Sequence, residues 1–212
     1  MRMLRLCLLS LAAFPLVPQD RNSLPPDIHP VTLSRLPPVT AADLDEEGRR
    51  LLAARTNYTP APGPTHITAY SPRELDLGIP SGEKSPVGPR YFQLAALIAA
   101  RESDQQYEWS SHEPAGRRQG LEQSVIDVVK YNRDVTGLSD KDATVITFGR
   151  ALFREHRISS ELWAKMVGYF GRQRTVQFMM IMGDYFRVAL MLNAVDQHLP
   201  PGREALLPAL KR

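Results

Sequence analysis

The chain has little cysteine and no clear metal-ligand pattern. Its single cysteine, Cys7, lies in an apolar stretch near the N-terminus. One thiol excludes an intramolecular disulfide, and removal of that stretch would leave neither a cysteine nucleophile nor a thiolate metal site. No His-x-x-x-His pair and no carboxylate pair with ligand spacing occurs in the sequence. We therefore expect no bound metal.

A cationic start followed by an apolar run occurs only in the first twenty residues. There, Met1–Arg5 precedes the apolar stretch Leu6–Val17. This pattern predicts a secretory leader over residues 1–19, too short for a comfortable membrane span. We expect a secreted or periplasmic protein with no stable membrane span after processing. A retained N-terminal anchor or a buried first helix is the alternative.

Basic clusters are missing as well. The formal net charge is +3, and loss of a leader that contains Arg2 and Arg5 would lower it by two. Proteins that bind nucleic acid concentrate lysine and arginine on one face or along one helix. No basic run follows the leader. The sequence therefore gives no indication of a nucleic-acid partner.

Proline is abundant, and it is concentrated in the N-terminal part of the chain. Six prolines lie between residues 18 and 40, and seven more lie between residues 59 and 89. Because proline removes an amide donor and disrupts helices, we expect residues 20–89 to form an arm and a loop with one short helix, about Asp43–Arg55. The arm would lie on the surface or on a neighbouring subunit. The long loop would cover a site or serve an interface.

From Tyr91 onward the apolar residues recur at helical spacing, which predicts an all-α region with brief turns. Serine supplies two helix starts, at Ser139 and at Ser159 or Ser160, and Gly171 supplies a stop. The predicted helices are Tyr91–Arg101, Leu121–Tyr131, one that begins after Ser139, one from Ser159 or Ser160 to Gly171, and Arg174–Asn193.

The last predicted helix is apolar nearly all round, so we expect it to be central or to pack between subunits. Asp184 and Arg187 lie in its middle. Ionised groups are costly in lipid, and these two residues are three apart, so they can pair with each other on one helical face. This argues against a lipid-facing span. Its methionines are best explained as core packing.

The segment from Gln105 to His112 brings together one acid, one indole and one imidazole. Glu108 and His112 are four residues apart, so on a helix the carboxylate could fix the imidazole tautomer for proton transfer. An ordinary surface ion pair is the plainer interpretation. Pro114 adds an alternative geometry, in which Ser110 or Ser111 is the N-cap and Glu108 precedes the helix.

Several short motifs downstream of residue 90 share their order and spacing with one family. They are Tyr107-Glu108-Trp109 with His112, Gly120-Leu121, the Phe148–His156 helix, Tyr169-Phe170-Gly171, Gly183-Asp184-Tyr185 and Leu199-Pro200-Pro201. Over residues 90–202 the chain resembles the carboxymuconolactone decarboxylase family of the alkylhydroperoxidase D-like superfamily, which leaves residues 203–212 as a tail. The resemblance implies an alkylhydroperoxidase D-like helical bundle that forms homo-oligomers, often trimers or hexamers.

The peroxidase branch of that superfamily uses a Cys-x-x-Cys-x-x-x-His motif with an upstream Glu. His112 matches the histidine, but Gln105 and Glu108 stand where the two cysteines belong, and Gln93 stands where the Glu belongs. An amide and a carboxylate cannot form a sulfenic acid or a disulfide. Peroxidase activity is therefore disfavoured. The decarboxylase branch, which also lacks the cysteines, implies a reaction that needs no metal or organic cofactor.

The resemblance also implies roles for the residues of the Gln105–His112 segment. His112 would be the proton donor or base, and Glu108 its orienting partner or co-base. Trp109 would be an apolar wall of the substrate site, although an indole is as often structural. The remaining substrate-binding candidates are Gln105 and one of the arginines Arg101, Arg117 and Arg118.

These roles predict an acid/base lyase for a small carboxylated or lactone substrate. Two other classes stay open. The protein could be a non-catalytic oligomeric scaffold or binding protein that kept the fold. Alternatively, Glu108, His112 and a loop histidine such as His66 could meet in space and bind a metal.

Overall fold

The computed structural model describes residues 24–55, 58–70 and 82–209. Within these ranges it contains seven α-helices and no β-strand, so the all-α prediction is confirmed. The predicted leader over residues 1–19, with Cys7, lies outside the described residues, as does part of the proline-rich loop, residues 71–81.

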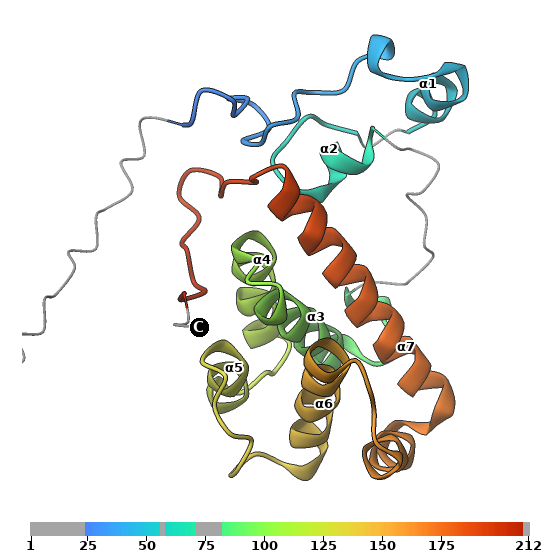
Figure 1. Ribbon diagram of the computed structural model, residues 1–212, viewed down its shortest axis with the longest axis vertical. Coiled ribbons are helices and arrows are strands. Elements are labelled where there is room, and N and C mark those ends of the chain that lie inside the picture. The colour runs from blue at the N-terminus through green and yellow to red at the C-terminus, as the bar shows by residue number, and fades with distance from the viewer. Residues whose placement is uncertain (1–23, 56–57, 71–81, 210–212) are drawn as a thin grey trace, which may run out of the picture.

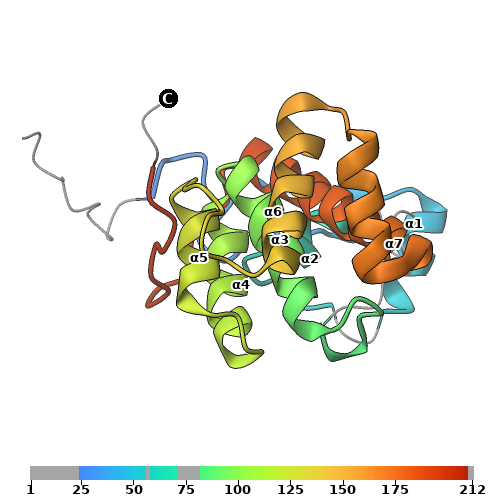
Figure 2. The ribbon, with the colours of Figure 1, turned by 90° about the horizontal axis from the view of Figure 1, so that it is seen from below.

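Helix α3 (Pro89–Glu102) is the centre of the bundle. Every residue from Phe92 to Arg101 is buried, because other helices surround α3. These are α4 (Gln106–Arg118), α5 (Gln123–Lys130), α6 (Asp140–Arg150) and α7 (Ser160–Ala194). Figure 1 shows α5 and α6 at one end of the bundle and α2 at the other, and Figure 2 shows α4 and α7 on different sides of α3.

Helix α4 begins at Gln106, before the start that an N-cap at Ser110 or Ser111 would give. The side chain of Gln105 accepts a hydrogen bond from the Tyr107 amide at 2.6 Å, which makes Gln105 the N-cap. Ser110 and Ser111 are interior residues whose hydroxyls donate to the Tyr107 carbonyl at 3.0 Å. The alternative N-cap at Ser110 or Ser111 is therefore wrong.

Two other helix starts follow the sequence. The Ser139 hydroxyl accepts from the amide of Asp142 at 3.1 Å, and the Ser159 hydroxyl accepts from the amide of Leu162 at 3.2 Å. Between them, α6 continues into a π-helical turn, Ala151–Glu155, and ends at His156. Of the two candidates for the second cap, the structure selects Ser159.

Helix α7 consists of two helical parts joined at Gly171. This residue has φ 74° and ψ 164°, a conformation that glycine adopts without the steric cost of a Cβ. The predicted stop at Gly171 is therefore confirmed. Asp184 and Arg187 form the expected ion pair, with an oxygen–nitrogen distance of 2.6 Å.

One face of the second part of α7 packs into the bundle and the opposite face is open. Phe178, Ile181 and Met182 are buried, whereas Val176 and Leu190 are about half exposed. By length and composition alone, α7 is the one helix of the described part that could cross a membrane. Its buried face packs on α3 within the same chain.

The N-terminal part contains more helix than the sequence indicated. Helix α1 (Glu46–Ala53), capped by Asp45, and the 3-10 turn Ala41–Asp43 account for the predicted short helix. A second short helix, α2 (Pro64–Thr68), and a 3-10 turn, Gly82–Lys84, lie where only loop was expected. The prediction of one short helix was wrong because proline is tolerated in a first helical turn, as Pro64 is in α2.

The proline-rich arm lies on the chain's own last helix. The Arg35 amide donates to the Val195 carbonyl at 2.9 Å, and the His198 amide donates to the Leu33 carbonyl at 2.9 Å. Gln197 adds side-chain bonds to the Thr32 and Leu33 carbonyls. The arm therefore fixes the end of α7.

Candidate functional site

Glu108 and His112 lie on one face of α4 and touch. The His112 Nε2 atom is 3.2 Å from a carboxylate oxygen of Glu108, and the side chains are 15% and 6% exposed. Both groups are thus largely removed from water. The contact is the i,i+4 pair that the sequence predicted, and it lies inside the protein rather than on its surface.

The other ring nitrogen of His112 faces Gln93 on α3. Nδ1 lies 2.7 Å from the amide oxygen of Gln93. An amide oxygen only accepts, so Nδ1 carries a proton and donates. Nε2 then directs either a lone pair or a second proton at Glu108. The 3.2 Å contact is short enough for a proton to pass between Nε2 and the Glu108 oxygen.

Aromatic rings enclose the imidazole. The Tyr185 ring on α7 meets it edge to face, with centroids 4.7 Å apart and planes at 85°. Phe92 on α3 lies 6.3 Å away and packs on Tyr185 at 5.6 Å. Sequence reasoning assigned no function to Gln93 or Tyr185. Both positions had a signal, since Gln93 stands where the peroxidase branch has its upstream Glu and Tyr185 belongs to the Gly183-Asp184-Tyr185 motif.

Tyr185 keeps its phenolic proton at neutral pH. Burial raises its pKa above the ordinary value of 10, and the negative charges of Glu108 and Asp184 raise it further. Both causes favour the neutral phenol over the phenolate. Tyr185 therefore keeps a hydrogen-bond donor on the ring that packs against His112.

Trp109 lies on the neighbouring face of α4. It is fully buried, and its indole nitrogen donates to Glu113 at 2.5 Å. Glu113 also accepts from Arg117 at 2.6 Å and from Lys130 at 2.9 Å. Trp109 and Arg117 therefore belong to a structural cluster, and the structure does not bring Arg117 to the Glu108–His112 pair.

The Glu113 carboxylate already accepts hydrogen bonds from the other side chains of this cluster. Burial favours the neutral form of the Glu113 carboxyl, but the hydrogen bonds from Arg117, Lys130 and Trp109 outweigh it and hold the pKa of Glu113 below its ordinary value. Glu113 is thus ionised and saturated with donors.

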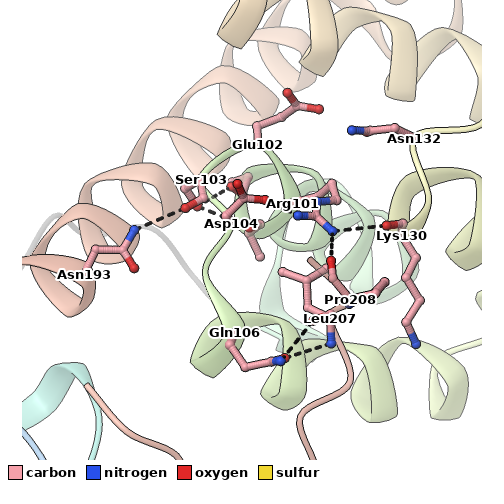
Figure 3. A network of polar contacts seen from close by, with 12 residues as sticks. Arg101, Glu102, Ser103, Asp104, Gln106, Lys130, Asn132, Asn193, Leu207 and Pro208 are labelled. Atoms are coloured by element: carbon pink, nitrogen blue, oxygen red, sulfur yellow. Dashed lines mark hydrogen bonds and ion pairs between the residues drawn. The ribbon is translucent and has the colours of Figure 1, made fainter. Parts of the chain in front are cut away.

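Arg101 anchors the C-terminal tail (Figure 3). Its buried guanidinium donates to the carbonyls of Pro208 at 2.8 Å and Lys130 at 3.2 Å, and it pairs with Asp104. It follows Gln93 by eight residues, which is about 12 Å along a helix. Its guanidinium is therefore occupied at a distance from His112, so the proposed substrate role of Arg101 has no support in the geometry.

Gln106 fixes the same tail from α4. Its side-chain amide donates to the Leu207 carbonyl at 3.0 Å and accepts from the Leu207 amide at 2.8 Å (Figure 3). The Leu207 side chain joins the main core. The tail after residue 202 is therefore bound to the bundle at Leu207 and Pro208.

The remaining predicted binding residues take different places. Gln105 is close to the pair in sequence, but its amide caps α4 and donates to Asn193 at 2.7 Å, so both ends are engaged. Arg118 is exposed at the C-terminal end of α4. It follows His112 by six residues, about 9 Å along the helix.

The arginine that the sequence did not indicate is Arg203, in the tail. Its guanidinium donates to the Ser111 hydroxyl at 3.1 Å and lies over the Tyr107 ring, 4.9 Å from the centroid. Tyr107 and Ser111 precede Glu108 and His112 by one residue each. Among the described residues, Arg203 has no carboxylate partner, which distinguishes it from Arg101 and Arg117.

His66 does not join the pair. It is buried in α2, and its Nε2 atom lies 2.8 Å from the Ser34 hydroxyl. Burial lowers the pKa of His66, which favours a neutral ring. The three-residue metal site of Glu108, His112 and His66 is therefore absent, and the described part of the chain holds no other group of three His, Cys, Asp or Glu residues that could bind a metal ion.

Comparison of the chain with protein-family models gives no match, and comparison with curated proteins gives none either. The chemistry of the site is therefore argued from its own geometry.

Proposed function

We propose that the protein is a cofactor-free acid/base enzyme of the carboxymuconolactone decarboxylase type, acting on a small carboxylated or lactone substrate. The observation that carries this proposal is the imidazole of His112, held between the Gln93 amide and the Glu108 carboxylate in a largely buried, aromatic setting. A general acid needs a fixed tautomer, an available proton and little competing water. The pair meets these requirements.

In this mechanism the substrate loses carbon dioxide and is protonated at carbon. The bond from the α-carbon to the carboxylate carbon breaks, and its electron pair remains on the substrate as an enolate. A proton carried by the His112–Glu108 pair then transfers to the α-carbon. Water returns a proton to the pair. Gln93 keeps Nδ1 protonated throughout, so that Nε2 is the nitrogen that exchanges its proton.

The substrate carboxylate needs a cation, and Arg203 is the arginine best placed to supply it. Its guanidinium lies on Tyr107 and Ser111, next to the Glu108–His112 stripe of α4. A planar guanidinium can bind a carboxylate through two hydrogen bonds. The terminal nitrogens of both Arg101 and Arg117 already bind protein acceptors.

The test is turnover of a panel of acidic lactones and β-keto acids, followed as carbon dioxide release. We expect His112→Ala to lower kcat by at least about 100-fold, the usual contribution of a positioned acid or base. His156→Asn is the matched control, because His156 is exposed and has a positive φ that asparagine tolerates. Equal turnover by the native protein and His112→Ala would rule out the proposal.

A second candidate is a non-catalytic oligomeric scaffold. The exposed apolar residues Val176, Met180 and Leu190 follow one face of α7, opposite its buried face, and such a face favours contact with a second copy of the chain. Homo-oligomerisation, as a trimer or hexamer, is also part of the leading proposal. Light scattering measures the oligomer, and lack of turnover with the whole panel would favour the scaffold.

We keep the secreted or periplasmic location as a proposal. It rests on the cationic and apolar pattern of residues 1–19. N-terminal sequencing of the mature protein is the direct test, and a mature chain that retains Met1 would contradict it.

A further inference from the structure

Tyr185 packs next to the Glu108–His112 pair, and its hydroxyl makes no hydrogen bond within the described part of the chain that would stabilise the fold. Its ring packs edge to face on both His112 and Phe92. A phenylalanine would make the same ring contacts. The packing therefore explains an aromatic residue at position 185, but it does not explain the hydroxyl.

The hydroxyl of Tyr185 has no hydrogen-bond partner among the described residues, and it is not sealed from solvent. Tyr107 and Tyr70, in contrast, donate to the carbonyls of Pro62 and Pro37. An unpaired polar group in a mostly buried position costs about 1–3 kcal/mol unless water or a ligand satisfies it. The site thus holds one free donor beside its acid.

We propose that the Tyr185 hydroxyl is the hydrogen-bond donor for the enolate oxygen that develops when the substrate loses carbon dioxide. The inference rests on the proposed function and names the anionic intermediate that the site stabilises. An oxygen that gains negative charge in a dry site is stabilised best by a donor already in place. Arg203 would hold a carboxylate of the substrate, and Tyr185 the oxygen of the reacting carbonyl.

The location favours Tyr185 as donor over Glu108 and His112. In the proposed mechanism the pair delivers its proton to carbon and loses it during the reaction. Tyr185 keeps its proton, because burial and the negative charge of Glu108 raise its pKa above the ordinary value. Donor and acid are therefore separate groups, as protonation of an enolate at carbon requires. The bond broken is carbon to carboxylate, the bond formed is carbon to hydrogen, and the phenol is unchanged.

The experiment compares Tyr185→Phe with Tyr169→Phe. Tyr169 lies on the same helix and is 42% exposed, so its substitution is the matched control. We expect Tyr185→Phe to lower kcat by about 100-fold, the usual effect of removing one oxyanion donor. KM should change by less than about threefold, and the stability of the protein should stay within about 1 kcal/mol of the native value. Tyr169→Phe should resemble the native protein in every measurement.

A second measurement is independent of turnover. Oxalate, a planar dianion that mimics an enolate, is titrated calorimetrically into metal-free protein, and NMR of the His112 ring shows whether the pair is intact. We expect oxalate to bind the native protein and Tyr169→Phe, and to bind Tyr185→Phe at least about tenfold more weakly.

The outcomes separate the two proposals. Turnover that is equal in the native protein and Tyr185→Phe overturns the role of Tyr185 and leaves the proposed function intact. If the native protein turns over no substrate, the proposed function fails. The oxalate titration then tests the role of Tyr185 by itself. Weaker binding by Tyr185→Phe supports the donor role, whereas equal binding, or no binding by the native protein, overturns it.

Discussion

Helix α4 carries two glutamates on neighbouring faces, and they have opposite surroundings. Glu113 accepts hydrogen bonds from Trp109, Arg117 and Lys130. Glu108 has His112 as its partner, at 3.2 Å. Both carboxylates are buried. The first is saturated and can only hold the fold together, whereas the second keeps unused acceptor capacity beside a titratable ring. The number of donors, rather than burial, distinguishes the structural acid from the candidate catalytic one.

The largest expected effect is a loss of stability when Glu113, the carboxylate with several donors, is removed. Glu113→Ala would leave the Lys130 ammonium, whose side chain is 11% exposed, without its carboxylate. Removal of one partner from a buried ion pair typically costs about 3–5 kcal/mol, so the free energy of unfolding should fall by that amount. Urea denaturation followed by circular dichroism measures it. A change below about 1 kcal/mol would show that Glu113 is not structural and would remove the contrast between the two faces.

The second expected effect is a loss of turnover when Glu108, the carboxylate paired with His112, is replaced. Glu108→Gln preserves the size of the side chain but cannot take up a proton, so kcat should fall by about 100-fold. The free energy of unfolding should change by less than about 1.5 kcal/mol, because only one partner is affected. Glu113→Gln, made in parallel, is the control and should lower stability more than turnover. If both variants lost stability and activity equally, the two faces would not have separate roles.

The third and smallest expected effect is a dependence of stability on pH. The pKa of Glu113 is lowered in the folded protein, so its ionised form is favoured by folding. This stabilisation is fully present above the ordinary carboxyl pKa of about 4.5 and is lost as the pH falls below it, through the lowered folded pKa. Unfolding measured between pH 6 and pH 3 should therefore show a larger acid-dependent loss of stability in the native protein than in Glu113→Gln. Identical profiles in the two proteins would assign the acid sensitivity to other carboxyls, such as Asp142, whose pKa is also lowered.

The helices were the most predictable part of the molecule. The caps Ser139 and Ser159 and the break at Gly171 could be located from the sequence because each is a local effect of one residue on its own turn. Helix α2 was missed because Pro64 marks a loop as readily as it begins a helix.

The candidate site was only partly predictable. The Glu108–His112 contact follows from i,i+4 spacing. The partners Gln93 and Tyr185 come from other helices, and no spacing rule brings residues 93, 112 and 185 together. Arg101 and Arg117 failed as substrate-binding candidates for the same reason, since a list of nearby cations does not show which are already occupied by Asp104 or Glu113.

The sequence by itself determined the helical class and the pairing of Glu108 with His112, because backbone periodicity and capping act over a few residues. Tertiary structure alone decided which glutamate was saturated and which tyrosine kept a free hydroxyl. Those properties depend on donors supplied by other helices and by the tail. Because these groups are buried, each hydrogen bond that is made or missing changes the free energy of folding.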